Sequence, residues 1–295
     1  MRPGYDEIKN LVEANLLKYL PECDSECSVL GEAMKYSLEA GGKRLRPVLL
    51  IASCRVAGGR DEDALPYACA IEFIHTYSLI HDDHPSMDND DLRRGKPTNH
   101  KVFGDDMAIL AGDGLLNSAM DVMFDDIAAH SGEEAERRIM AAREISRAAG
   151  VRGMIAGQTS DVRPELIGLP DAEKLLYIHR HKTGAIIRAA AAAGAFLGGA
   201  EESVRKALSL YAEKTGTAFQ IIDDILDVVG DAGKLGKNTG VDSELGKLTY
   251  PALYGVEKSR EFAKEATDEA CGALKDIDNS EFLKGLALDL LDRIS

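Results

Sequence analysis

Residues 74–88 read IHTYSLIHDDHPSMD, an apolar helical stretch that runs into three aspartates. Residues 219–227, FQIIDDILD, form a second stretch of the same kind. Uncompensated carboxylates in apolar surroundings repel one another and are costly to desolvate. Both stretches therefore predict helices whose carboxylates meet a cation.

The spacing of these aspartates indicates how they are presented. Asp223 and Asp227 are i and i+4, which predicts that they share one helix face, with Asp224 beside them. Asp82 and Asp88 are 88 − 82 = 6 residues apart, ~240° around a helix at ~100° per residue, and so lie on different faces. Pro85 is placed to break or bulge the helix and return Asp88 toward the same metal.

Oxygen-only ligand clusters suit a hard cation. Mg²⁺ typically takes one or two carboxylates, several waters and phosphate oxygens of a substrate. Two facing aspartate clusters therefore predict a bound diphosphate.

Composition excludes several functions. The 295 residues carry 35 basic and 50 acidic side chains, a net charge of −15 that argues against nucleic acid or anionic membrane as a partner. No linker or low-complexity block divides the chain, so we expect one domain over residues 1–295. Five scattered cysteines and the absence of an N-terminal apolar signal segment indicate free thiols in a cytoplasmic protein. No uninterrupted apolar stretch approaches ~20 residues, which predicts no membrane span.

Helical periodicity runs almost throughout. Apolar residues recur at three- and four-residue spacing in residues 5–19, 29–40, 65–83, 108–129, 134–149, 172–197, 203–229 and 248–277. Gly41-Gly42 is expected to close one helix and Pro47 to open the next. Alternating strand patterns are absent, so we predict an all-α bundle of roughly ten or more helices. The alanine-rich residues 189–195 allow close helix packing in either a core or an interface.

Cations gather beside glycines and the acidic motifs. Lys43, Arg44 and Arg46 lie in the glycine turn GGKRLRP, and Arg93, Arg94 and Lys96 follow the first motif. Further cations are Arg180, Lys182, Lys237 and Lys247. Arg44 and Arg180 are interpreted as salt-bridge partners. The rest favour two diphosphate pockets, one held by metal and one by arginine and lysine alone.

The chain resembles the trans-isoprenyl diphosphate synthases, most closely the short-chain bacterial farnesyl diphosphate synthases. The matching blocks, in the family's order, are residues 41–47, 74–83 and 87–100, Gly157-Gln158 with Asp161, residues 181–184, Phe219-Gln220 with residues 223–227, and residues 246–251. The resemblance implies an isoprenoid-synthase-type helical bundle with a central active-site cavity, and usually a homodimer. It also implies head-to-tail condensation of isopentenyl diphosphate with dimethylallyl and geranyl diphosphate to give farnesyl diphosphate.

Residue roles follow from the same resemblance. Asp82, Asp88 and Asp223 would bind three Mg²⁺ ions that hold the allylic diphosphate, assisted by Arg93, Lys182 and Lys237. Isopentenyl diphosphate would be held by Lys43, Arg46, His75 and Arg94, and Thr183 and Gln220 would place oxygen dipoles near the developing carbocation. We expect Lys182, Thr183 and Gln220 to be the catalytic residues.

Chain length is predicted to depend on Tyr77 and Ser78. Ser78 is i−4 from Asp82, and Tyr77 lies ~7.5 Å down the helix axis at ~1.5 Å per residue. Because helical side chains lean toward the N-terminus, the ring would form a floor that admits a geranyl chain and stops growth at C15. The alternative is an ordinary core tyrosine and a geranylgeranyl product.

Departures from the family pattern are few. His84 stands where relatives usually carry leucine and is interpreted as a loop histidine facing solvent, Val241 replaces a lysine, and Asp105-Asp106 is taken as surface variation. Three alternatives remain: a class I terpene cyclase, a phosphohydrolase using His81-Asp82, and a catalytically silent subunit. The second motif and the glycine-rich cationic turn argue against the cyclase, the spacing of the other histidines against the phosphohydrolase, and two intact aspartate motifs against the silent subunit.

Overall fold

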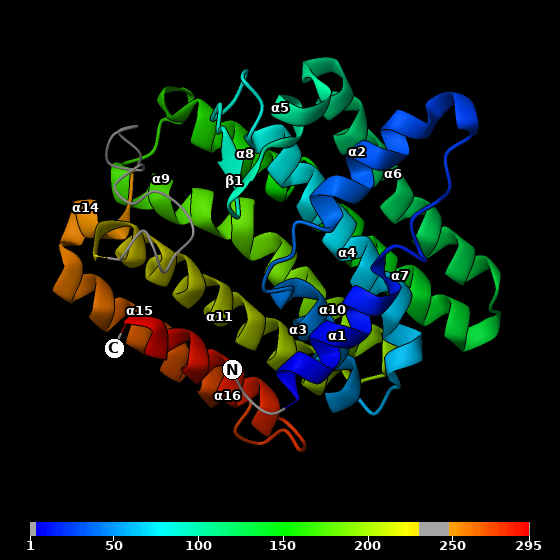
Figure 1. Cartoon of the computed structure of the whole chain (residues 1–295). Helices are drawn as coiled ribbons and strands as arrows, with labels where there is room; N and C mark the ends of the chain where they lie inside the picture. Colours follow the sequence, from blue (N-terminus) through cyan, green and yellow to red (C-terminus); the bar gives the residue numbers. More distant parts are fainter. Residues whose placement is uncertain (1–3, 230–247, 295) are drawn as a thin grey trace.

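The computed structural model describes residues 4–229 and 248–294, and these form an all-α fold, as predicted (Figure 1). The helices are α1 (Tyr5–Leu16), α2 (Ser28–Leu38), α3 (Leu45–Val56), α4 (Asp61–Asp82), α5 (Asn99–Phe103), α6 (Asp105–Ala128), α7 (Gly132–Ala149), α8 (Met154–Val162), α9 (Asp171–Ile178), α10 (Ala185–Leu197), α11 (Glu202–Val229), α14 (Tyr250–Tyr254), α15 (Val256–Ala273) and α16 (Glu281–Leu291). Short turns are η1 (Ser25–Cys27), η2 (Pro164–Leu166) and η4 (Asp292–Ile294), and η3 (His179–Gly184) is a π-helical turn.

Several boundaries differ from the sequence prediction. Helices α5, α8 and α16 were not predicted, and residues 172–197 are interrupted by the π-helical turn η3. Residues 248–277 divide at Gly255, whose φ of 79° suits glycine. Pro47 is the third residue of α3 rather than its first. One small antiparallel ladder joins β1 (Leu92–Arg93) to β2 (Lys96–Pro97), because Arg94 and Gly95 both take positive φ in the tight turn between them.

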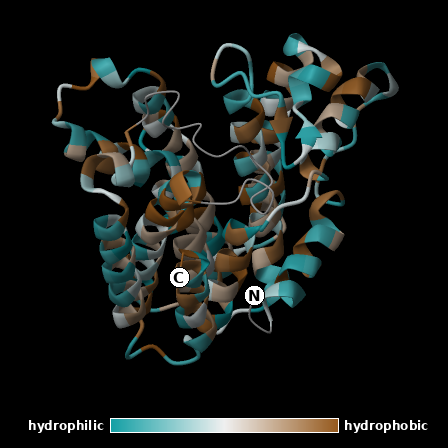
Figure 2. Cartoon of the chain, turned by 60° about the vertical axis from the view of Figure 1, so that its left-hand side comes forward, coloured by the Kyte–Doolittle hydropathy of each residue, from teal (hydrophilic) through white to brown (hydrophobic). Residues whose placement is uncertain are grey.

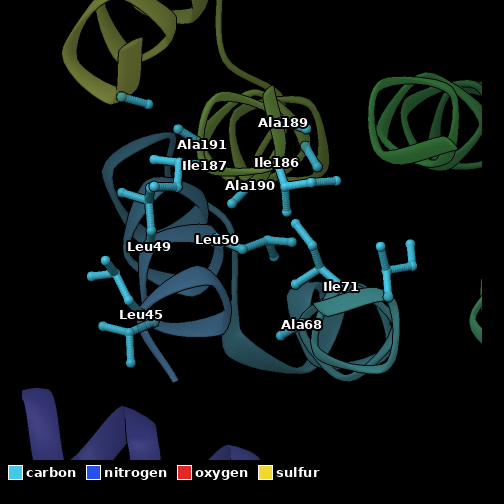
Figure 3. Close-up of a cluster of buried hydrophobic side chains, with 14 of the residues drawn as sticks. Leu45, Leu49, Leu50, Ala68, Ile71, Ile186, Ile187, Ala189, Ala190 and Ala191 are labelled. Carbon is cyan, nitrogen blue, oxygen red and sulfur yellow. The ribbon is translucent and has the colours of Figure 1, made fainter. Parts of the chain in front are cut away.

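The centre of the bundle is built from α3, α4 and α10. Figure 3 shows Leu49 and Leu50 of α3, Ile71 of α4 and the start of α10 converging on one apolar cluster. A Cβ at Gly194 would lie 2.1 Å from the backbone oxygen of Leu50, so α10 approaches α3 at backbone contact. All of residues 189–195 are buried within the chain. The alanine-rich segment therefore belongs to the core.

The remaining long helices surround this centre. Helix α6 packs along α4, and α15 packs along α11. Figure 2 shows hydrophobic positions concentrated on the central helices and hydrophilic ones more frequent on the outer helices. Among the helices that the structure describes, α6 has the length and apolar composition of a membrane span, and 44% of its apolar window is buried in the fold. Core helices of soluble proteins meet the same test, so the absence of a span stays a prediction.

Candidate active site

A cavity of about 1220 Å³ lies among α3, α4, α6, α8, η3, α11 and η4. Twelve of the fourteen predicted site residues line it: Lys43, Arg46, His75, Tyr77, Ser78, Asp82, Arg93, Arg94, Lys182, Thr183, Gln220 and Asp223. Asp88 is not among the lining residues, and Lys237 and Lys247 fall outside the described residues. The fold thus gathers residues from most of the chain into one cavity.

The first aspartate motif bends as its proline predicts. Helix α4 ends at Asp82, and the Asp88 N–H donates to the Asp82 carbonyl oxygen at 2.9 Å. The chain therefore curls back on itself and places Asp88 beside Asp82, where its charge acts on the Asp82 carboxylate. His84 does not simply face solvent: its Nε2 is buried, and its ring lies edge-on to His100 at a centroid distance of 6.1 Å.

Asp82 is held by side chains from two other elements. The Gln158 amide of α8 donates to its Oδ1, and Lys182 Nζ of η3 lies 3.7 Å from its Oδ2. Lys182 Nζ also lies 2.6 Å from Oδ2 of Asp161, a second α8 residue. Burial raises the pKa of Asp82 to about 6, although Lys182 opposes the shift. Burial opposes the charge of Lys182, but Asp82 and Asp161 together raise its pKa.

Backbone contact between α8 and η3 makes this arrangement possible. A Cβ at Gly157 would lie 2.0 Å from the Lys182 backbone nitrogen, so only glycine lets the two elements touch. The π-helical turn widens the helix at Lys182 and Thr183, both of which line the cavity. Gln158 and Asp161 belonged to a matching block without an assigned role. Gln158 and Asp161 are three residues apart, and Gln158 follows Gly157 directly. On a helix this spacing places both side chains on one face, which was the signal in the sequence that they act at one site.

Arg93 is paired within the motif that precedes it. Its guanidinium contacts the buried Asp83 carboxylate and lies 3.1 Å from Asp90 Oδ2. It lines the cavity while neutralising Asp83, which does not line it. To contact the substrate as predicted, Arg93 would have to leave Asp83 and Asp90, or bind the substrate while it still contacts them.

The second motif divides its aspartates among different partners. Asp223 lines the cavity, with Arg293 Nη1 3.2 Å from its Oδ1. Asp224 is turned toward α14, where its Oδ2 accepts the Tyr250 N–H at 3.0 Å. Asp227 is buried, 3% exposed, and does not line the cavity. Of these two carboxylates only Asp223, the one assigned as a metal ligand, reaches the cavity wall, and Asp227 lies one helical turn further along α11.

The cationic pocket forms where the glycine turn meets β1 and α4. A Cβ at Gly42 would lie 2.7 Å from the Arg94 guanidinium, which donates to the Gly41 carbonyl oxygen. Arg46 lines the cavity with Nε buried and without a protein partner. Burial, with Arg46 and Arg94, lowers the pKa of His75 well below its usual value. His75 is thus neutral, and arginines dominate the charge of a pocket suited to an anion.

Arg44, in contrast, is structural, as predicted. It contacts Glu72 Oε1 at 2.7 Å and Glu13 Oε1 at 2.9 Å, and its side chain is fully buried. Arg180 pairs with Glu213 at 3.4 Å outside the cavity, also as predicted.

Helices α4 and α6 together wall the part of the cavity beside Tyr77, where α6 contributes Asp113 and Leu116. Tyr77 is 7% exposed and its ring meets the His81 ring edge-on at 5.6 Å. His81 Nε2 lies 3.1 Å from the Ile109 carbonyl oxygen of α6. A Cβ at Gly112 would lie 2.1 Å from that nitrogen, so a glycine makes room for the imidazole. Ser78 donates its hydroxyl to the His75 carbonyl oxygen at 2.8 Å.

The donor set fits magnesium. Among the residues that the structure describes, no three His, Cys, Asp or Glu side chains lie together as a self-sufficient metal site. Asp82 and Asp223 instead offer carboxylates from opposite motifs, and the buried Gln158 Oε1 beside Asp82 has no protein partner. Such a sparse oxygen set matches Mg²⁺, which relies on substrate phosphate and water for its remaining ligands.

The fold and these two motifs define a helical prenyl diphosphate synthase. A model of the polyprenyl synthetase family matches residues 27–284, and the chain belongs to this family. It is a trans-prenyltransferase, which sets aside the cyclase and phosphohydrolase alternatives.

Two curated relatives illustrate the similarity. The chloroplastic large subunit 1 of the heterodimeric geranylgeranyl pyrophosphate synthase of Arabidopsis thaliana is 49% identical over 262 residues, 87% of this chain and 70% of that protein. The dimethylallyltranstransferase of Fischerella ambigua is 44% identical over 265 residues, 90% of this chain and 74% of that protein.

Solved structures agree on the fold. An FPP/GFPP synthase from Zymomonas mobilis matches with a TM-score of 0.83 at 35% identity, over 97% of each chain. The geranylgeranyl pyrophosphate synthetase from Pyrococcus horikoshii matches with a TM-score of 0.84 at 31% identity, over 98% of each chain.

Proposed function

We propose that this enzyme condenses isopentenyl diphosphate with dimethylallyl diphosphate and then geranyl diphosphate, and releases farnesyl diphosphate. The observation that carries the C15 product is the position of Tyr77. Its ring lines the cavity from the helix that bears Asp82, is almost fully buried, and is held by His81. A ring fixed in this way limits the depth available to a growing chain.

Two parts of the cavity receive the two substrates. Asp82, Asp88 and Asp223 would hold Mg²⁺, which supplies charge to bind the allylic diphosphate and stabilise it as it departs. Lys182 adds a fixed cation beside Asp82, and Gln158 fixes the orientation of that carboxylate. Lys43, Arg46, Arg94 and neutral His75 provide the metal-free pocket for isopentenyl diphosphate.

The chemical step follows from this placement. The allylic carbon–oxygen bond breaks and its electron pair leaves with the diphosphate, which gives an allylic cation. The hydroxyl of Thr183 and the amide oxygen of Gln220, both in the cavity wall, are placed to stabilise that cation through their dipoles. The double bond of isopentenyl diphosphate forms the new carbon–carbon bond. A proton then passes to the released diphosphate, and a new double bond completes the product.

A C20 product is the second candidate. The relatives from Arabidopsis and Pyrococcus are named for geranylgeranyl diphosphate synthesis, whereas the Zymomonas structure is named for FPP and GFPP. These names span several chain lengths, so the local wall of the cavity is the better guide.

Product analysis decides between the two. The purified chain is incubated with Mg²⁺, isopentenyl diphosphate and each of dimethylallyl, geranyl and farnesyl diphosphate in turn. We expect C15 from the first two primers and negligible extension of the third. Efficient conversion of farnesyl diphosphate to C20 would contradict the proposal.

We also propose a homodimer that uses the outer face of α6. Ile109, Leu110 and Phe124 on this helix are 44%, 50% and 62% exposed, three apolar side chains on an outer face that also carries Asp113, Asn117 and Asp121, and the other side of the helix is in the core. Sedimentation of the wild type and of Phe124→Glu checks this, with a shift toward monomer expected for the variant. Action in the cytoplasm stays a prediction.

A further inference from the structure

Three aspartates of the two motifs each meet a cation from another element. Lys182 lies near Asp82, Arg93 contacts Asp83, and Arg293 Nη1 lies 3.2 Å from Asp223 Oδ1. The first two cations fall within the family pattern. Arg293 lies beyond residues 27–284, which that pattern covers, and lines the cavity nonetheless.

The position of Arg293 is fixed by its neighbours. It belongs to η4, which follows α16 directly, and both elements pack against α11, the helix of Asp223. The next residue, Ile294, is buried at 6% exposure and anchors the turn. Side chains of Arg293 and Asp223 are 24% and 32% exposed, so the pair lies at a partly covered edge of the cavity.

We propose that Arg293 is a placeholder for the metal at Asp223: it pairs with this carboxylate in the metal-free enzyme and leaves it when Mg²⁺ and diphosphate bind. The inference rests on the proposed function, because it requires Asp223 to be a metal ligand. A magnesium ion approaches a carboxylate oxygen to ~2.0–2.1 Å. A guanidinium on the same oxygen would then face a divalent cation of like charge, which favours its departure.

The exchange also connects the metal site to the C-terminal turn. Because η4 is held on α11 partly through the Arg293–Asp223 pair, occupation of Asp223 by metal removes one of its attachments. The turn should therefore loosen when the first substrate's diphosphate is bound. A partly exposed ion pair is weak, so the competition it exerts on metal binding amounts to a factor of about five.

Calorimetry with inorganic pyrophosphate and Mg²⁺ tests the inference without turnover. We expect Arg293→Ala to bind magnesium pyrophosphate about fivefold more tightly than the wild type, since a competing cation is gone. The matched control is Arg260→Ala, which removes an arginine paired with Glu257 on α15, away from the cavity. Its affinity should equal that of the wild type. Unchanged or weaker binding by Arg293→Ala would overturn the inference, since a purely structural role predicts weakening.

Hydrogen exchange provides a second measurement. In the wild type, magnesium pyrophosphate should speed exchange of the amides in Asp292–Ile294, while amides around Asp82 become more protected. Slower or unchanged exchange in that turn would show that Arg293 keeps its place. A wild type that binds no magnesium pyrophosphate would contradict the proposed function itself, which distinguishes the two failures.

Discussion

The ring of Tyr77 meets the imidazole of His81 edge-on, at a centroid distance of 5.6 Å, in the wall of the cavity. His81 is in turn positioned by its contact with the Ile109 carbonyl oxygen, and its ring packs directly against Gly112. Burial raises the pKa of Tyr77 to about 12, so its hydroxyl stays neutral. The tyrosine is therefore part of a rigid wall between α4 and α6, and its removal should be felt by the growing chain.

Product length should respond to this wall. Tyr77→Ala removes the ring and is expected to shift the main product to C20 or longer, because the deleted volume lies below the metal site. Truncating a large buried side chain costs about 3–5 kcal/mol of stability, so melting curves must accompany product analysis. Tyr77→Phe, which keeps the ring, should still give C15. A C15 product from Tyr77→Ala at the wild-type rate would place the floor on another helix.

The opposite substitution should shorten the product. Ser78 lines the cavity one turn below Asp82, and Ser78→Phe adds an aromatic ring above the Tyr77 floor. We expect more C10 product from dimethylallyl diphosphate, read by chromatography of the dephosphorylated alcohols. An unchanged C15 fraction would mean that this side chain lies outside the path of the tail.

Metal binding should depend on one carboxylate from each motif. Asp82→Ala or Asp223→Ala is expected to lower turnover on the order of a thousandfold or more, because charge stabilisation of the departing diphosphate is lost. The fold should stay intact, since burial already disfavours ionised Asp82 and its removal relieves repulsion from Asp88. Circular dichroism checks the fold. Unchanged turnover in either variant would contradict the metal assignment.

Arg46 should distinguish the two diphosphate pockets. We expect Arg46→Ala to raise the KM for isopentenyl diphosphate about tenfold or more, the value of a lost charge-assisted hydrogen bond. The KM for geranyl diphosphate, measured in the same preparation, is the internal control and should change less. A larger change in the geranyl diphosphate KM would show that the pockets are assigned in reverse.

The loss of folding stability at acidic pH should depend in part on His179. Burial, partly offset by Asp161, lowers the pKa of His179 to about 4, although Asp224 Oδ2 lies 3.7 Å from its Nε2. The unfolded chain protonates this histidine near pH ~6.5, so the stability from its neutral form is present above that pH. That stability is lost progressively as the pH falls from ~6.5 to about 4.

The measurement is urea unfolding of the wild type and His179→Gln across this pH range. Between pH ~6.5 and pH ~4 the free energy of unfolding should fall by about 2–3 kcal/mol less in His179→Gln than in the wild type. Because His75 is also held neutral by burial, the variant should keep part of the acid sensitivity. Parallel curves for the two proteins would show that His179 does not contribute.

The sequence alone determined the helical fold, the two aspartate motifs and the cationic glycine turn. Helical periodicity is set by residues three and four positions apart, and ligand chemistry by residue type, so both can be read from the chain. The bend after Asp82 likewise follows from Pro85, within the same short segment. The function of Arg44 as a structural ion-pair partner was also predicted, although its partners were not.

Only the tertiary structure decided which of these polar groups face one another. Gln158 reaches Asp82 across 76 positions of the chain, and Arg293 reaches Asp223 across 70. The hydrogen bond that Asp224 accepts from the Tyr250 N–H, at the start of α14, and the burial of Asp227 depend on how α11 is rotated against its neighbours. The sequence of the alanine-rich segment is compatible with either a core or an interface. The contact of Gly194 with the backbone of α3 places the segment in the core. Such contacts join segments remote in sequence, and side-chain spacing within one helix carries no information about them.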